Sequence, residues 1–397
     1  MKLSLPYIKD IKISNYKQFD EIHLSNLGRI NLITGDNNVG KTSLLETFYL
    51  NDSLLLNTNF IHKSLCHRGV HCHLDKWFKP GLEVNNRKDD IATIRDYFND
   101  YILNQKESPV KVIQSFNNGT KLSIEICTKG FSQLSEVEKV NIYQSDFVGL
   151  NTVPYYILQY NNDVLKDVNN LYLDDFERNR NKFLQYFPLI SASDSYDDDL
   201  TEYYYSALNY SERFTNLNLS SRNWIFKLLQ NLEPGFERME VGVFESKTML
   251  SVKLKNKEEL IPVTWMGQGF QRYLRMILEL VSSTDPEKEI RFMIDEVENG
   301  IHFTRLNEMW RSLFSVVKST KLQLFLTTHS LECIKAFVEV GLEDDNLDFK
   351  SELRQVEIES NTIDGRLKHY ASTYDIETLE QGLYSGVNLR GGDLWRK

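Results

Sequence analysis

Short runs of consecutive apolar residues predict three buried strands along this chain. The runs span residues 30–34, 290–294 and 322–327, and each is mostly apolar and β-prone. Uninterrupted runs of this kind are typical of strands that are buried on both faces of a parallel sheet, because half-exposed strands alternate apolar and polar positions. The pattern therefore predicts an α/β protein.

Helical periodicity occupies several stretches beside these runs. Residues 43–46 begin a helical pattern shortly after the first run, and residues 273–280 form a longer amphipathic run. Apolar residues near helical spacing over 163–187 favour another helix, and residues 374–384 favour a last one. Helices are thus expected along the chain before and after the predicted strands.

Two weaker strand signals complete the pattern. Residues 110–113 and 121–126 are strand-like and flank the turn residues Asn117, Asn118 and Gly119, which predicts a β-hairpin. Residues 353–359 can add a last strand. The chain is therefore predicted to contain a hairpin far from the three buried strands in sequence.

The first buried strand leads into GDNNVGKT, which spans residues 35–42 and matches the pattern GxxxxGK[ST] in full. Glycines let backbone amides curl around phosphates, and the helix that follows adds the partial positive charge of its N-terminus. Lys41 is predicted to reach the β- and γ-phosphates, and Thr42 to hold Mg²⁺. The predicted nucleotide-binding residues are Gly35, Asn37, Asn38, Gly40, Lys41, Thr42 and Ser43. The motif thus predicts binding of ATP or GTP.

Acidic residues end the second strand, and a histidine follows the third. Asp295 is predicted to bind magnesium with its water, and Glu296 to orient or deprotonate the attacking water. The His329 ring can hydrogen-bond the γ-phosphate and so report its presence. We therefore predict Glu296 and His329 as catalytic residues, and Thr42 and Asp295 as magnesium ligands.

Gly267, Gln268 and Gly269 precede the long amphipathic helix. Exposed amides at a helix start attract anions, so this loop is a second candidate for phosphate binding. One nucleotide cannot occupy both helix starts of a subunit if they lie on opposite faces, so we expect each to serve a neighbour's ATP. This arrangement predicts a homodimer or higher homo-oligomer, although by itself Gly-Gln-Gly is a weak signal that favours a plain loop before a helix.

Composition narrows the class of protein. The 397 residues, 41% of them hydrophobic, can bury a large core in two or three domains. A net charge of -10 argues against binding nucleic acid through bulk charge, and a local basic groove stays open. No apolar stretch approaches the roughly 18 residues that span a bilayer, and four scattered cysteines build no disulfide framework. We therefore expect a cytoplasmic protein without a membrane partner.

In this order, the segments GDNNVGKT, MGQGFQR, IDEVENGIH and LTTHS resemble the ABC-type AAA family ATPases of the OLD, RecF and SMC group. Residues 11–19 are similar to the strand pair that precedes the phosphate loop in that group. The resemblance covers the first 50 residues and roughly residues 220–341. It implies a P-loop NTPase with an ABC-type ATPase head, in which helices flank a mixed sheet and an insertion separates the Walker A and signature motifs.

Family motifs then fall on particular residues. The resemblance implies a Walker A loop at residues 35–42, a signature loop at 267–269, Walker B acids at Asp295 and Glu296, a D-loop at 299–302 and a switch histidine at His329. It also favours ATP over GTP. Gln268 stands where the family commonly has serine, which predicts a longer or weaker contact with the opposing γ-phosphate. The Q-loop residue stays open among Gln133, Gln144 and Gln159.

These motifs divide the chain into three parts. Residues 1–50 and 216–397 are predicted to form the ATPase head, and residues 51–215 an insertion that is mostly helical with a strand hairpin. An insertion of this size is too short for a long coiled coil, which argues against a true SMC protein. Its acidic, tyrosine-rich residues 191–210 are expected to form an exposed turn, with a partner contact as the alternative.

Residues 62–73 of the insertion hold a dense group of potential metal ligands, namely His62, Cys66, His67, His71, Cys72 and His73. The spacing matches no standard zinc pattern, and no second ligand pair follows at a suitable distance. Adjacent side chains on one short segment cannot all face one ion. We therefore expect ordinary loop and packing residues, with a metal site as the alternative.

The stretch after His329 shows no set of acidic strand ends for the TOPRIM nuclease domain that OLD nucleases carry there. The resemblance is thus to stand-alone forms, as in the ATPase subunits of antiphage defence systems. It predicts a sensor or regulatory subunit that dimerises around ATP, hydrolyses it and controls a separately encoded nuclease or toxin. The alternative is a RecF-like repair ATPase that clamps DNA, which the acidic balance does not favour.

Overall fold

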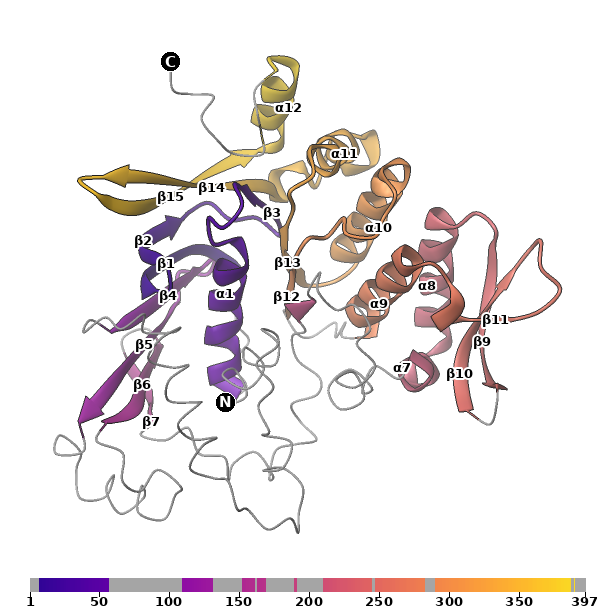
Figure 1. Cartoon of the computed structure of the whole chain (residues 1–397), viewed down its shortest axis with the longest axis horizontal. Helices are drawn as coiled ribbons and strands as arrows, with labels where there is room; N and C mark the ends of the chain where they lie inside the picture. The colour runs from indigo at the N-terminus through magenta and orange to yellow at the C-terminus, as the bar shows by residue number, and fades with distance from the viewer. Residues whose placement is uncertain are drawn as a thin grey trace, which may run out of the picture.

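The computed structural model describes residues 7–56, 109–130, 152–160, 163–168, 189–190, 210–244, 247–282, 290–386 and 389. Within these residues the strands form two six-stranded sheets and one three-stranded sheet (Figure 1). Every helix in the described part of the chain is too short or too polar to cross a membrane. The two larger sheets and the helix between them organise the molecule.

A mixed sheet forms the centre of the fold. Its strands, in spatial order, are β15 (Arg366–Asp375), β14 (Leu353–Ile363), β3 (Ile30–Gly35), β13 (Leu322–Thr327), β12 (Ile290–Ile294) and β8 (Leu189–Ile190). All neighbours pair in parallel except β14 and β15, which are antiparallel. Every residue of β3, β12 and β13 is buried, which confirms the predicted parallel strands. The predicted α/β class with a mixed sheet flanked by helices is confirmed.

A second sheet is antiparallel throughout. It consists of β2 (Phe19–Leu24), β1 (Ile8–Tyr16), β4 (Val110–Phe116), β5 (Lys121–Gly130), β6 (Thr152–Tyr160) and β7 (Asp163–Val168). Pairing of β4 with β5 confirms the predicted hairpin. The helix expected over 163–187 is wrong for residues 163–168, because hydrogen bonds to β6 recruit them as a strand. Strands from the predicted insertion thus extend the sheet that β1 begins, and the division of the chain at residue 50 stays a prediction.

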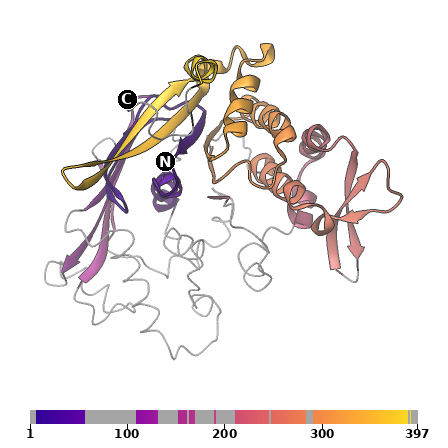
Figure 2. The same ribbon diagram turned by 45° about the horizontal axis from the view of Figure 1, so that its top comes forward.

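Helix α1 (Lys41–Leu56) lies between the two large sheets (Figure 2). It contacts β5 of the antiparallel sheet and β3, β12 and β13 of the mixed sheet. Its residues Leu44, Leu45 and Phe48 are fully buried, and the Phe48 ring stacks on Phe325 with ring centroids 3.9 Å apart. A helix with sheets on both sides must be apolar on more than one face, so α1 lacks a strong polar side.

Helices also cover the other face of the mixed sheet. They are α9 (Gln268–Ser282), α10 (Leu306–Lys318) and α11 (Leu331–Gly341), while α8 (Leu219–Leu232) packs on α9 and α10. Beyond them lie α7 (Tyr210–Asn216) and a small sheet of β9 (Phe236–Phe244), β10 (Lys247–Leu254) and β11 (Ile261–Pro262), and the chain's last described helix is α12 (Ile376–Tyr384). The strand expected over residues 353–359 is confirmed as β14, but it is not the last, because β15 follows it without having been predicted. The helix expected over 374–384 is confirmed as α12 apart from its first two residues, which end β15.

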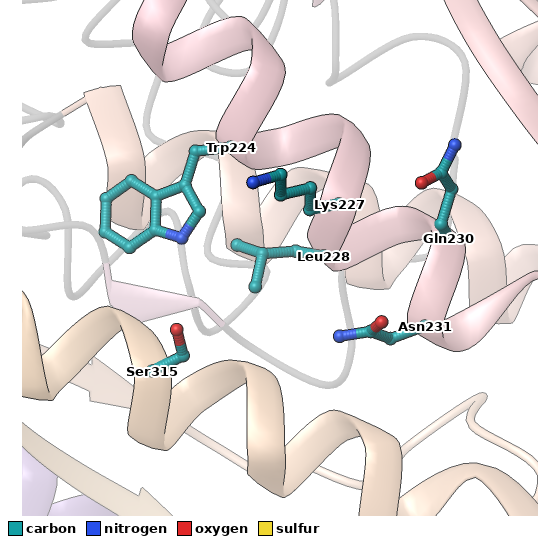
Figure 3. Close-up of a pocket in the computed structure, with 6 residues that line it drawn as sticks. All are labelled: Trp224, Lys227, Leu228, Gln230, Asn231 and Ser315. Carbon is teal, nitrogen blue, oxygen red and sulfur yellow. The ribbon is translucent and has the colours of Figure 1, made fainter.

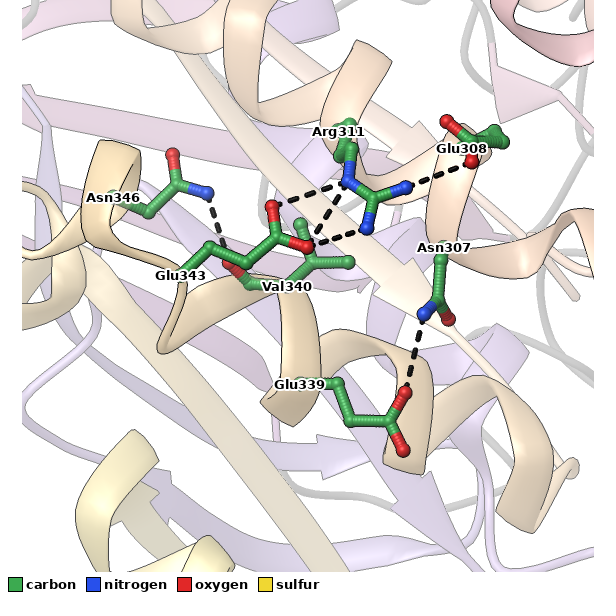
Figure 4. Close-up of polar contacts among 7 residues, drawn as sticks. All are labelled: Asn307, Glu308, Arg311, Glu339, Val340, Glu343 and Asn346. Atoms are coloured by element: carbon green, nitrogen blue, oxygen red, sulfur yellow. Dashed lines mark hydrogen bonds and ion pairs between the residues drawn. The ribbon is translucent and has the colours of Figure 1, made fainter.

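At the surface, α10 and α11 are tied by a polar network (Figure 4). The Arg311 guanidinium donates to both carboxylate oxygens of Glu343, with Nε at 3.0 and 3.1 Å, and to Glu308 at 2.7 Å. Asn307 donates to Glu339 at 3.1 Å. These groups are partly exposed, so the network adds about 1 kcal/mol or less to stability, and buried packing carries the fold.

Glu357 lies on β14 beside the strand that enters the phosphate loop, paired with Thr34. Its burial, together with the negative charges of Glu359 and Asp36, raises its pKa to about 6. A carboxyl whose pKa is higher in the folded than in the unfolded chain weakens the fold as pH rises through that range. The negative charges of the neighbouring acids therefore disfavour the ionised form of the buried Glu357 side chain.

We expect Glu357→Gln to stabilise the protein at neutral pH. The amide removes a charge that the native state disfavours, so the free energy of unfolding should rise by about 1 to 2 kcal/mol above pH ~7. Below pH ~4.5 both states of the wild type are protonated, and the difference should vanish. Urea unfolding across this pH range is the measurement, with Glu21→Gln, at an exposed position of β2, as the control. A gain that does not depend on pH would contradict the electrostatic cause.

Candidate functional site

The predicted site residues follow three neighbouring strands of the mixed sheet. β13 pairs in parallel with both β3 and β12, so the carboxyl ends of the three strands meet at one edge. The phosphate loop follows β3, Asp295 and Glu296 follow β12, and His329 comes shortly after β13. Ligands of α/β proteins bind at this edge of the sheet. Residues separated by almost the whole chain are thus brought to one place.

The loop of residues 35–42 wraps around the Lys41 side chain. The Lys41 ammonium donates to the carbonyl oxygens of Gly35 at 2.7 Å and Asp36 at 2.8 Å. Asp36, Asn37 and Asn38 are exposed at the outer side of the loop. Burial lowers the pKa of Lys41 to about 8, while the carboxylate of Asp295 acts in the opposite direction. The Lys41 ammonium is therefore held where a bound anion would offset the free-energy cost of burying its charge.

Gly40 brings the turn between β1 and β2 against this loop. A Cβ atom on Gly40 would lie 2.0 Å from Nε2 of Gln18 and 2.6 Å from the Phe19 ring, and the residue has a φ of +103°. Next to it, Lys17 forms a buried ion pair with Glu46 of α1. Only glycine fits this close approach. Gln18 is a neighbour of the phosphate loop that sequence reasoning missed, because no local motif marks it.

Thr42 and Asp295 meet as predicted. The Thr42 hydroxyl donates to Oδ2 of Asp295 at 2.9 Å, which joins the start of α1 to the end of β12. Oδ1 of Asp295 accepts from the Thr327 hydroxyl. A hydroxyl and a carboxylate are the hard oxygen donors that Mg²⁺ prefers. The residues present therefore fit a magnesium ion.

Thr327 connects the two acids, and sequence reasoning missed it. Besides its bond to Asp295, its Oγ1 accepts the backbone N–H of Glu296 at 2.8 Å. Thr327 is fully buried. The available signal was a polar residue at the end of a mostly apolar strand, two residues before His329.

Glu296 has an unusual backbone. Its φ is +48°, in the left-handed region that costs a residue with a Cβ atom about 1 kcal/mol or more. The Arg272 guanidinium donates through Nη2 to the carbonyl oxygens of Asp295 and Glu296, both at 2.8 Å. Sequence reasoning predicted no role for Arg272, although it ends the segment MGQGFQR, because nothing along the chain shows what its side chain reaches. The surrounding contacts hold the backbone in this conformation.

His329 lies in the loop between β13 and α11, where it is exposed. Its backbone N–H donates to Oε1 of Glu298 at 3.1 Å. Ser330 then caps α11 by accepting the N–H of Cys333 at 3.1 Å. These contacts fix the backbone of the loop at the edge where the phosphate loop also lies.

The loop of residues 267–269 lies against residues 299–302 of the same subunit. A Cβ atom on Gly269 would lie 2.0 Å from the carbonyl oxygen of Gly300, so only glycine permits this approach. Gly267 and Gln268 are exposed, and Gln268 is the first residue of α9. Two large aromatic side chains flank the contact, Trp265 with 67% and Phe303 with 65% of their surface exposed.

Several predicted features stay unassigned. Gln133, Gln144, the His and Cys group of residues 62–73 and the tyrosine-rich residues 191–209 lie outside the described residues. Gln159 lies on β6, paired with Ser123, and the Q-loop residue therefore stays open. In the described ranges no three His, Cys, Asp or Glu side chains gather as a metal site.

A pocket of about 490 Å³ lies between α8 and α10 (Figure 3). It is lined by Trp224, Lys227, Leu228, Gln230, Asn231 and Ser315. None of these belongs to the predicted site. The candidate site is thus an exposed edge of the sheet rather than this pocket.

The AAA ATPase domain family model matches residues 7–191 and 190–334. The chain belongs to this family. Its mixed α/β sheet with a phosphate loop is the fold of P-loop NTPases, and the chain is an ABC-type ATPase that binds ATP. The predicted enzyme class is therefore confirmed.

Individual relatives agree with this family. The chain is similar to an ATP/GTP phosphatase of Helicobacter pylori, with 24% identity over 359 residues that cover 85% of this chain and 89% of the relative. It is also similar to the DNA replication and repair protein RecF of Clostridium botulinum, with 20% identity over 373 residues that cover 84% and 95%. Among solved structures, the SMC head domain from Thermotoga maritima matches with a TM-score of 0.43 and 12% identity over 91% of this chain and 97% of that one.

Nucleotide binding should depend on the protonation of Lys41. Because burial lowers its pKa to about 8 in the free protein, ATP must bind together with a proton above that pH. The affinity for ATP should then weaken by up to about tenfold per pH unit between pH ~8 and 10. Titration calorimetry in buffers of different ionisation enthalpy measures the affinity and the proton uptake together. An affinity that stays constant over this range, without proton uptake, would refute the depressed pKa.

Proposed function

We propose that this ATPase is the sensor or regulatory subunit of a bacterial antiphage defence system. In this proposal two subunits close around ATP, and hydrolysis of the ATP opens them. The open and closed states differ in their affinity for a separately encoded effector, a nuclease or a toxin. The contacts that join Thr42, Asp295, Thr327 and Glu296 carry the proposal, because they gather the groups for hydrolysis at one sheet edge.

In the hydrolysis step, the phosphate loop binds the triphosphate through its amides and the Lys41 ammonium. Thr42 and Asp295 would hold Mg²⁺, which neutralises charge that develops on the phosphates. Glu296 orients the attacking water and accepts its proton as the water oxygen attacks the γ-phosphorus. His329, exposed at the same edge, hydrogen-bonds the γ-phosphate. The products are ADP and inorganic phosphate.

Dimerisation is supported by the exposed surface around residues 267–269. Gly267 and Gln268 at the start of α9 are accessible to a second subunit, and Trp265 and Phe303 flank them as exposed aromatic side chains. Exposed aromatics on a polar surface are enriched at protein interfaces. A second copy of this chain that brings its phosphate loop to this surface would cover them and place the two glycines near its γ-phosphate.

An effector on a separate chain is supported by the use of the segment after His329. β14 pairs with β3 in parallel, β15 pairs with β14, and α12 packs on both strands. Residues 353–384 therefore complete the ATPase sheet instead of building a second catalytic fold. The proposal accordingly places the nuclease or toxin activity on a partner protein.

A RecF-like ATPase that clamps DNA is the second candidate. The similarity to RecF proteins over 84% of this chain favours it. A net charge of -10 weighs against it, because DNA affinity rests on neutralising phosphates. Salt-dependent DNA binding by the ATP-bound protein separates the two candidates.

Glu296→Gln is the variant that tests the proposal. It should bind ATP like the wild type yet hydrolyse it at least about a hundredfold more slowly, because the water loses its base. Glu339→Gln, on the exposed side of α11, is the matched control. Near-normal turnover by Glu296→Gln would remove Glu296 from this role.

The same variant should be held in its closed state, so it can be purified from its own host in ATP. A nuclease or toxin that co-purifies in stoichiometric amount, and whose activity changes when ATP is replaced by ADP, is the expected result. DNA whose binding weakens steeply with salt, without such a protein, would support the RecF-like candidate instead.

Trp265→Ala should weaken the ATP-dependent dimer. Loss of a large aromatic side chain from an interface commonly costs 10-fold or more in affinity, so we expect the dimer dissociation constant to rise at least about tenfold. Analytical ultracentrifugation in the Glu296→Gln background with ATP measures it. Tyr384→Ala, which removes an aromatic side chain that is 85% exposed on α12, is the control. Equal effects of the two substitutions would argue against this interface.

A further inference from the structure

We infer that Arg272 is a positioning residue for Glu296 and that it links the start of α9 to the hydrolysis step. Arg272 lies on the first turn of α9, four residues after Gln268. Its guanidinium reaches across to the loop that follows β12. This inference rests on the proposed role of Glu296 and on closure of two subunits around ATP.

Arg272 binds the backbone of the two acids. Nη2 donates to the carbonyl oxygens of Asp295 and Glu296, both at 2.8 Å. Two hydrogen bonds from one charged group to successive carbonyls restrain the two peptide planes on either side of the Glu296 Cα atom. The direction of the Glu296 side chain follows from these planes, because together they set where its Cα–Cβ bond points.

Glu296 needs such restraint because its backbone is in a sparsely populated conformation, with a φ of +48°. The Thr327 hydroxyl accepts its N–H at 2.8 Å, and Arg272 binds its carbonyl oxygen. The residue is therefore held from both sides of its Cα atom. Of the two restraints, Thr327 belongs to the sheet, whereas Arg272 belongs to a helix whose start is exposed.

The start of α9 is also joined to the loop after Glu296 by a second contact. Gly269 approaches Gly300 so closely that a Cβ atom would lie 2.0 Å from the Gly300 carbonyl oxygen. Gln271 holds the preceding residues by donating to the carbonyl oxygens of Met266 at 2.6 Å and Thr264 at 3.2 Å. Residues 264–272 and the loop of residues 295–300 thus form one contiguous unit, and they include the surface proposed to meet the partner's ATP.

Because these residues form one unit, contact with the partner's ATP can control hydrolysis at Glu296. When the partner's triphosphate contacts Gly267 and Gln268, any shift of the α9 start is passed through Arg272 to the backbone of Glu296 in the same subunit. Each subunit then hydrolyses its own ATP only when its α9 has engaged the neighbour's. Hydrolysis at the two sites of the dimer is coupled in this way.

The test compares Arg272→Ala and Arg272→Lys with the wild type. Because a misplacement of a catalytic group by about 1 Å can cost about a hundredfold, we expect kcat of Arg272→Ala to fall by about 10- to 100-fold. KM for ATP should stay within about twofold, because Arg272 is not itself a predicted phosphate ligand. Arg272→Lys keeps the charge and one donor group, and should recover part of kcat.

Dimerisation separates positioning from a general structural defect. In the Glu296→Gln background, Arg272→Ala should still form the ATP-dependent dimer, as measured by analytical ultracentrifugation. Arg311→Ala is the matched control, since it removes an arginine of α10 that bridges Glu343 and Glu308 and has no role in the predicted site, so kcat should stay unchanged (Figure 4).

Each outcome decides the inference. A low kcat with normal KM and normal dimerisation supports it, and partial rescue by lysine strengthens that result. A kcat equal to that of the wild type overturns it, as does a parallel loss of ATP binding and dimerisation in both Arg272 variants. Failure of the proposed function would appear differently, as normal turnover by Glu296→Gln with Arg272 intact.

Discussion

Parallel hydrogen bonding of β3 with β13, and of β13 with β12, is the constraint on which the rest of this structure depends. It joins residues near the start of the chain to residues near 295 and 327, and all three strands are buried on both faces. Because parallel strands end at the same edge, this pairing determines where the phosphate loop, the acids and His329 lie. Helix α1 packs between the two large sheets and stabilises this arrangement.

The charged side chains at this edge of the sheet are stabilised by short polar contacts, and not by being kept far apart. Lys41 is buried enough to lower its pKa, yet it lies near Asp295 and is held by two carbonyl oxygens. Thr327 satisfies both acids from the neighbouring strand, one through its carboxylate and the other through its backbone. Groups that the fold holds in place in this way reduce the reorganisation that the chemical step needs.

The parts of the molecule differ in how much of their structure the sequence predicts. The three buried strands, the hairpin before and after Asn118 and the helix after Gly269 were predicted, because each has a local signal of period or turn chemistry. The helix expected over 163–187 was wrong where Asp163–Val168 pairs with β6, because hydrogen bonds to a neighbour overrode helical spacing. The phosphate-loop motif predicted Lys41 and the end of a buried strand predicted Asp295. No role was predicted for Thr327 and Arg272, although they lie in the segments LTTHS and MGQGFQR, or for Gln18.

The sequence by itself determined the chemistry available to this protein: a phosphate loop, paired acids and a second glycine loop, each recognisable because its spacing is local along the chain. Only the tertiary structure decided which of these groups meet. Contacts such as Arg272 with the carbonyls of Asp295 and Glu296, or Gly269 with Gly300, depend on how α9 packs beside the end of β12. Such long-range packing leaves no periodic trace in the sequence, because any residue of suitable reach can make the contact once the backbones are in place.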